Sequence, residues 1–85
     1  MYEENDLIGS DLQQSFSQYG RTVEIYIYRM PDTEWTLEIV DEYDNSTVWD
    51  ETFATDQLAL DAALKAFEEE SIYGFVGLGP DDVIH

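Results

Sequence analysis

The stretch from Arg21 to Phe53 constrains the fold more than any other part of the sequence. It contains three runs in which apolar and polar residues alternate with a period of two, the pattern of a strand with one buried face. The runs are separated by segments short enough for hairpin loops, so they predict three consecutive antiparallel strands. The residues expected to face inward are Val23, Ile25, Ile27, Trp35, Leu37, Ile39, Trp49 and Phe53.

The loops set the predicted register. A three-residue loop at Pro31-Asp32-Thr33 places Ile27 opposite Leu37 and Ile25 opposite Ile39, so both apolar sets share one face.

A second three-residue loop, Tyr43-Asp44-Asn45, has Asn45 in the left-handed conformation and places Trp49 opposite Ile39 and Phe53 opposite Trp35. A two-residue Asp44-Asn45 turn is the rival. We reject it because it would bury Asp50 as an unpaired acid and turn Trp49 outward.

Two helices are expected to flank the strands. From Ser10, Ser-Asp-Leu-Gln reads as a capping box, and Leu12, Phe16 and Tyr19 follow at helical spacing. Gly20 is expected to end this helix in a left-handed conformation. Thr55 is the expected N-cap of a second helix that ends near Ser71, and the alanine-rich run from Leu58 to Phe67 favours this helix. The apolar stripe of this second helix comprises Leu60, Ala63, Leu64 and Phe67.

The predicted fold is a single small acidic α+β domain over residues 1–85, with the order α-β-β-β-α. A three-stranded antiparallel meander has one face covered by both helices, and residues 1–9 and 77–85 are expected to be flexible. The tail from Ile72 onwards is expected to be an extended segment that packs loosely, and a short fourth strand over residues 73–76 is the alternative for part of it. The element order resembles that of double-stranded RNA-binding domains. The likeness stops there, because those domains need lysines where this chain has Thr55, Asp56 and Gln57.

Composition excludes several classes of function. The chain has no cysteine, which removes disulfides, thiolate catalysis and zinc–thiolate sites. It has no apolar run of the roughly 20 residues needed to cross a bilayer and no recognisable secretion signal, so we expect a cytoplasmic protein. The formal net charge of −17 opposes direct binding to nucleic acid or an anionic membrane. A basic partner is favoured.

No constellation predicts catalysis, a metal site or a cofactor. His85 is the only histidine and stands at the last position, so no histidine is expected to be fixed in place as the general base that activates a nucleophile. The acidic run Asp41-Glu-Tyr-Asp-Asn45 fails the spacing of a calcium loop, and the glycines from Gly74 to Gly79 lack the lysine of a phosphate loop. We therefore expect a protein that is not an enzyme.

The outward face of the predicted sheet is the candidate site. It combines tyrosine rings with carboxylates, and tyrosine supplies rigid contact area while acids attract a basic partner. We expect an interaction module that binds a basic protein surface, including as a nucleic-acid mimic. The alternative is a structural or self-associating domain, a homodimer formed by an open sheet edge or by this face, whose charge serves only solubility. The residues assigned to the face are Glu24, Tyr26, Tyr28, Glu34, Glu38, Glu42 and Asp50.

The charge also predicts how stability depends on salt. Mutual repulsion among seventeen excess negative charges should destabilise the fold at low ionic strength, and screening should relieve it. The melting temperature, followed by circular dichroism, should therefore rise between low and moderate salt. A flat or falling melting temperature would mean that the charges are already paired or harmlessly spaced.

Overall fold

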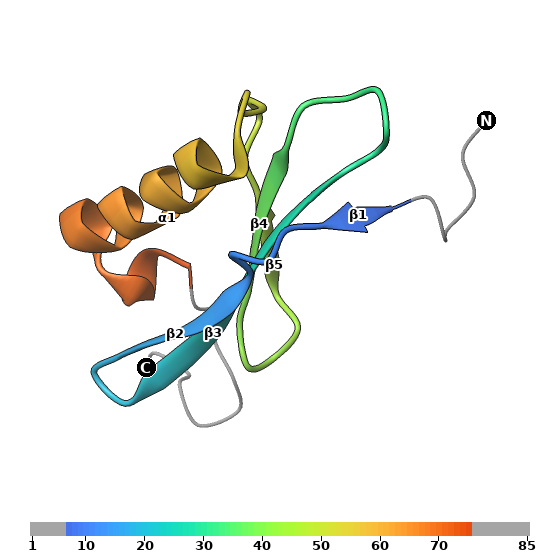
Figure 1. Ribbon diagram of the computed structural model, residues 1–85. Helices are drawn as coiled ribbons and strands as arrows, with labels where there is room; N and C mark the ends of the chain where they lie inside the picture. The colour runs from blue at the N-terminus through green and yellow to red at the C-terminus, as the bar shows by residue number, and fades with distance from the viewer. Residues whose placement is uncertain (1–6, 76–85) are drawn as a thin grey trace.

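The computed structural model describes residues 7–75, with Tyr73 described in its backbone only. Within this range an antiparallel sheet carries one α-helix on one face (Figure 1). The elements in chain order are β1 (Ile8–Gly9), β2 (Gln14–Gln18), β3 (Arg21–Arg29), β4 (Thr36–Val40), β5 (Ser46–Val48), α1 (Asp56–Glu70) and a 3₁₀ turn, η2 (Ile72–Gly74). The α+β class with an antiparallel sheet is confirmed, but the two predicted helices and three strands are not matched in detail.

The pairing of β3 with β4 follows the predicted register. Ile25 lies opposite Ile39, and Ile27 lies opposite Leu37. The loop between the strands is closed by the backbone of Met30 and by Thr33, whose N–H donates to the Met30 carbonyl oxygen. The Thr33 hydroxyl accepts from the Met30 N–H at 3.0 Å. All four paired side chains are buried, so the strands share one apolar face as expected.

The predicted first helix is wrong. Its residues form a turn and then β2, which pairs with β3 (Figure 1). Ser10 does accept a hydrogen bond from the Leu12 N–H at 2.9 Å, but the Gln13 side chain turns to the sheet, where its Oε1 accepts from the Ile27 N–H at 3.0 Å. The sheet overrides the local helical spacing because the outer edge of β3 needs hydrogen-bonding partners.

The segment Ser10–Gln13 bulges out of the strand pairing. Gly9 lies opposite Tyr28 and Gln14 opposite Ile25, so four residues stand against two on β3. The buried Ser10 hydroxyl donates to Asp56 Oδ2 at 2.8 Å. The bulge is thereby tied to the first turn of α1, 46 residues further along the chain.

A two-residue turn joins β2 to β3. Tyr19 and Gly20 have φ angles of 54° and 78°, and Gln18 pairs with Arg21 across them. Positive φ at both central positions defines a type I′ turn, which matches the twist of a hairpin. Gly20 is therefore left-handed, as predicted, but it closes a hairpin and does not end a helix.

The loop between β4 and β5 lies one residue earlier than predicted. It comprises Glu42-Tyr43-Asp44, closed by a bond from the Asp41 N–H to the Asn45 carbonyl oxygen, and Asp44 is the left-handed residue. The buried Asp41 carboxylate sets this position, since it accepts from the backbone N–H groups of Tyr43 and Asn45. It also accepts from the Asn45 side-chain amide at 3.0 Å.

The earlier loop shifts the β5 register by two residues but keeps each side chain on its predicted face. Thr47, not Trp49, lies opposite Ile39. The Trp49 N–H donates to the carbonyl oxygen of Leu37. The predicted pairing of Phe53 with Trp35 is correct. The two-residue shift in register is therefore confined to the chain before Phe53 and ends between Trp49 and Phe53.

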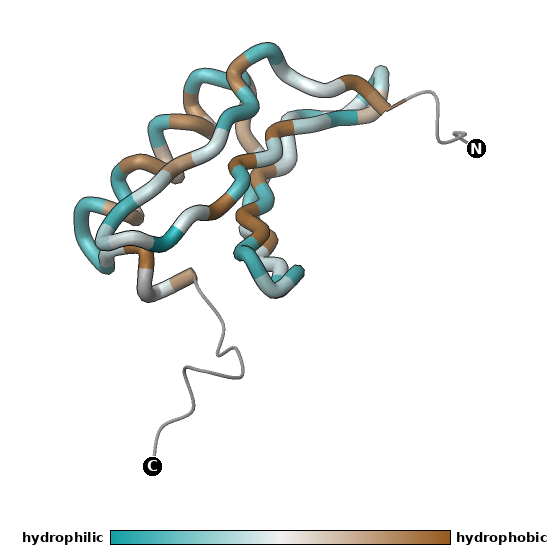
Figure 2. The backbone as a smooth tube through the Cα atoms, turned by 90° about the horizontal axis from the view of Figure 1, so that it is seen from below, coloured by the Kyte–Doolittle hydropathy of each residue, from teal (hydrophilic) through white to brown (hydrophobic). Residues whose placement is uncertain are grey.

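One face of α1 completes the core. Thr55 caps the helix by accepting from the Leu58 N–H at 3.1 Å, as predicted. Ala59, Leu60, Ala63 and Phe67 are buried. Leu64, predicted to be on the buried stripe, is 40% exposed and lies at its margin. Figure 2 shows the alternation of hydrophobic and hydrophilic residues along the strands that makes this one-sided core.

The chain after α1 also enters the core. Ile72 and Phe75 are buried, where a loosely packed extended segment was expected. The Phe75 ring stacks on Trp49 at 5.5 Å and meets Phe67 edge to face at 5.3 Å. The structure has a 3₁₀ turn over Ile72–Gly74 in place of the alternative fourth strand. Of the ends expected to be flexible, Ile8 and Gly9 pair with β3, and residues 1–6 and 77–85 lie outside the described range.

The hairpin turn gives a stability prediction. Gly20→Ala places a Cβ at a left-handed position and should lower the free energy of unfolding by about 1–2 kcal/mol. Gly20→Asn should cost less, because asparagine tolerates this conformation. Urea denaturation of both variants measures the difference. A steric clash would not explain a loss, since no atom of the described residues beyond the two chain neighbours lies within 4 Å of the point where the new Cβ would stand.

Candidate interaction face

The candidate site is the sheet face opposite α1, which we call the acidic face: Glu24, Tyr26, Tyr28, Glu34, Glu38, Glu42 and Asp50. Alternation along β3 and β4 turns its central side chains away from the core. Tyr26 is 40% exposed, and Val48 on β5 is 50% exposed. The described residues therefore leave this face open to solvent over β3, β4 and β5.

Glu38 lies at the centre of the acidic face. It is opposite Tyr26 on β3 and opposite Val48 on β5. The Tyr28 hydroxyl donates to Glu38 Oε1 at 2.9 Å, and the Ser46 hydroxyl donates to Oε2. Hydroxyl groups from the strands on both sides therefore fix this carboxylate in one orientation.

The Glu24 carboxylate, on the same face, is also held by a hydroxyl group, which comes from the neighbouring strand β2. Ser15 on β2 lies directly opposite Glu24, and its hydroxyl lies 2.8 Å from each carboxylate oxygen. Sequence reasoning missed Ser15 because it assigned this segment to a helix. The alternation of Ser15 and Ser17 around Phe16, which puts both hydroxyls on the face opposite the ring, was the available signal.

The remaining acids of the face lie towards its margins. The Thr52 hydroxyl donates to Glu34 Oε1 at 2.7 Å. Glu42 is in the β4–β5 loop, where it accepts from the Thr22 N–H at 3.1 Å and pairs with Arg21 at 3.4 Å. Asp50 is exposed and makes no hydrogen bond within residues 7–75. The structure thus joins Glu24, Glu34 and Glu38 to hydroxyl donors and leaves Asp50 apart.

Among the described residues, no cationic side chain compensates these three carboxylates. Arg21 pairs with Glu42. Arg29 lies over the Trp35 ring at 5.1 Å and donates to the carbonyl oxygens of Met30 and Pro31. Lys65, the third cation, is on α1, on the other side of the sheet. In the part of the chain that the structure describes, no salt bridge reaches Glu24, Glu34 or Glu38.

Other candidate sites receive no support from the described residues. Between residues 7 and 75, no group of three or more histidine, cysteine, aspartate or glutamate side chains could hold a metal ion. The acidic run from Asp41 to Asn45 has a structural use instead, since the Asp41 carboxylate orders its own loop. Within the same range, no helix is long and apolar enough to span a bilayer.

Comparison of the chain with protein-family models, with curated proteins and with solved structures finds no match. The function must therefore be argued from the geometry of the acidic face and from its charge.

The contact between Tyr28 and Glu38 gives a prediction for alkaline pH. Desolvation raises the Tyr28 pKa above its ordinary value of 10.0, and the hydrogen bond to Glu38 and its negative charge raise it further. A raised pKa in the folded state stabilises the fold below the unfolded-state value, and this contribution is lost as pH rises through the folded-state value. The stability advantage of the native chain over Tyr28→Phe should therefore shrink above about pH 10.

Urea denaturation across the alkaline range measures this difference. Tyr26→Phe is the matched control, because Tyr26 is on the same face of the same strand but does not donate to Glu38. A constant difference between the native chain and Tyr28→Phe at every pH would contradict the raised pKa of Tyr28.

Proposed function

We propose that the protein is a non-enzymatic interaction module whose acidic face binds a basic surface on another protein, in the cytoplasm. The observation that carries the proposal is the set of three carboxylates, Glu24, Glu34 and Glu38. Each is oriented by hydroxyl donors on the open side of the sheet, and none has a cationic partner among the described residues.

Orientation by hydroxyl groups favours binding. A carboxylate has about four lone-pair positions, so one or two hydroxyl donors leave acceptor capacity for an arginine or lysine. Since the hydroxyls already restrict the side chains, less conformational entropy is lost when a partner docks. The exposed Tyr26 ring, opposite Glu38, adds rigid contact area beside the charge.

A nucleic-acid-binding protein is the partner class that this arrangement suits best. Its surface already presents arginine and lysine side chains to an array of phosphates. Glu24 lies opposite Val40, two residues from Glu38, so the two glutamates are diagonal neighbours whose Cα atoms are about 7–8 Å apart. A sheet fixes such separations, whereas a disordered acidic tail does not. The acidic face would then act as a nucleic-acid mimic.

The test compares two variants of equal charge. The first, Glu24→Gln, Glu34→Gln and Glu38→Gln, removes three charges from the acidic face but keeps oxygen acceptors for the hydroxyls. The second, Asp61→Asn, Glu69→Gln and Glu70→Gln, removes three charges from the exposed side of α1. The native chain should capture a basic protein from a lysate of the source cells, and duplex DNA or RNA should displace it.

Binding constants for the captured protein then decide the result. The face variant should bind at least about tenfold more weakly, because a hydrogen bond to a charged group contributes about 1.5–3 kcal/mol. The helix variant should bind nearly as well as the native chain. Equal losses in the two variants would show that overall charge, not the acidic face, attracts the partner. Circular dichroism confirms that both variants fold.

A further inference from the structure

Among the described residues, the outer edge of β2 has backbone groups without a strand partner. Within residues 7–75, β2 pairs only with β3. The Ser10 N–H donates to the Ile27 carbonyl oxygen, and the Ile27 N–H donates to Gln13, so odd-numbered residues of β3 direct their backbone groups towards this edge of the sheet. Their partners on β2 are Gln14, Phe16 and Gln18. The N–H and C=O groups of Ser15 and Ser17 must therefore point away from β3.

The sequence of β2 is a palindrome, Gln14-Ser-Phe-Ser-Gln18. When two copies of such a strand pair in antiparallel orientation about the central residue, every residue faces its own type. Around it, the run from Leu12 to Gly20 contains no charged residue, in a chain of which 27% is charged. Edge strands are ordinarily protected by charged side chains, proline or short length. The five-residue β2 has none of these protections.

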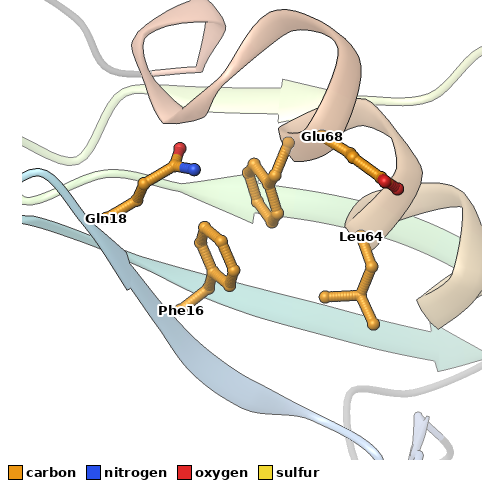
Figure 3. Close-up of a pocket in the computed structure, with 5 residues that line it drawn as sticks. Phe16, Gln18, Leu64 and Glu68 are labelled. Atoms are coloured by element: carbon orange, nitrogen blue, oxygen red, sulfur yellow. The ribbon is translucent and has the colours of Figure 1, made fainter.

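A shallow cavity of about 270 Å³ adjoins this edge, between β2 and α1. Its lining residues are Phe16, Gln18, Leu64, Phe67 and Glu68. Figure 3 shows Phe16 and Gln18 reaching from β2 towards α1, which contributes Leu64 and Glu68. The Phe16 and Phe67 rings stack at 4.2 Å. Leu64, which the apolar pattern of α1 assigns to the core, remains 40% exposed here.

We propose that a second copy of this chain binds along β2, in antiparallel orientation, with the two-fold axis at Phe16. This register is possible because the backbone N–H and C=O groups of Ser15 and Ser17 point away from β3. Ser15 of each copy would exchange backbone hydrogen bonds with Ser17 of the other, giving four bonds in total. The two Phe16 residues would form the central pair without mutual backbone bonds, with Cα atoms about 4.5 Å apart.

The side chains support the same pairing. In the joined sheet both Phe16 rings lie on the α1 side, where each enters the apolar space beside Leu64 of the other copy. The two Ser15–Ser17 pairs lie on the opposite side and keep their hydroxyl bonds to Glu24 and Thr22. The second copy would thus cover the exposed Leu64 without disturbing the acidic face. This pairing does not depend on the proposed function.

Charge distribution selects this edge over the other one. β5 has only three residues, and acidic side chains stand on both sides of it, at Asp44 and Asp50. Pairing two β5 edges would bring these like charges together. The neutral β2 edge keeps direct repulsion low, although each copy carries a net charge of −17. Self-association should therefore be weak at low salt and stronger when added salt screens the long-range repulsion.

The first test follows backbone amide hydrogen exchange by NMR at increasing concentrations of the full chain, in moderate salt. Exchange at the Ser15 and Ser17 amides should slow at least tenfold between micromolar and millimolar concentration. The Val48 amide is the internal control, because it points outward from the β5 edge. Unchanged exchange at Ser15 and Ser17, or slowing at Val48 instead, would overturn the proposal.

The second test uses sedimentation equilibrium and two variants of one residue. Ser17→Pro removes an outward N–H, which an edge strand tolerates, and should weaken self-association at least tenfold. Ser17→Ala removes the same hydroxyl but keeps the N–H, so it should associate like the native chain. Equal association of the two variants, or a native chain that stays monomeric at millimolar concentration in moderate salt, would overturn the proposal. The exchange test needs no variant and decides the matter if Ser17→Pro unfolds.

Discussion

The structure depends on the need of β3 for backbone partners on both of its edges. This nine-residue strand carries Val23, Ile25 and Ile27, which are 1% exposed or less, at the centre of the core. Leaving buried N–H and C=O groups without partners costs about as much as losing the hydrogen bonds themselves. β4 satisfies one edge. The segment before β3 must satisfy the other, and this requirement outweighs its weak preference for a helix.

The bulge shows how the requirement is met where regular pairing stops. Across Ser10–Gln13 the ladder with β3 is interrupted, yet Ile27 still has a partner for each backbone group. A side-chain amide oxygen, that of Gln13, replaces a backbone carbonyl. The Ser10 hydroxyl, in the bulge, donates to Asp56 and so joins the sheet to the start of α1. A local irregularity of the edge strand therefore also positions the helix.

The elements predicted correctly from the sequence are those whose local residue pattern agrees with their surroundings in the fold. The alternation on β3 and β4, with the short loop at Pro31-Asp32-Thr33, was enough for their pairing, and the alanine-rich run and Thr55 were enough for α1. The face of each strand residue was also predictable, since a shift of two residues in β5 preserves it. Most of the acidic face can thus be placed from the sequence alone.

The errors arise where one long-range contact decides between local alternatives. Leu12, Phe16 and Tyr19 have the spacing of a helix face, but Leu12 lies in the bulge, Phe16 packs on the core from a strand, and Tyr19 belongs to a turn. The spacing of these three residues does not reveal that one edge of β3 needs a strand to satisfy its backbone groups. Likewise, the buried carboxylate of Asp41 moves the β4–β5 loop by one residue, and its burial depends on the completed fold.

The strand that sequence reasoning missed connects the two surfaces for which we propose roles. Ser15 and Ser17 of β2 are on the same side of the sheet as the acidic face, where Ser15 orients Glu24. The residue between the two serines, Phe16, faces α1 and lies at the open edge. Because strand residues alternate between faces, one short neutral segment can order negative charge on one side and present an apolar contact on the other. Pairing of two β2 strands would then place both acidic faces on the same side of one continuous sheet, so that a long basic surface could contact both copies together.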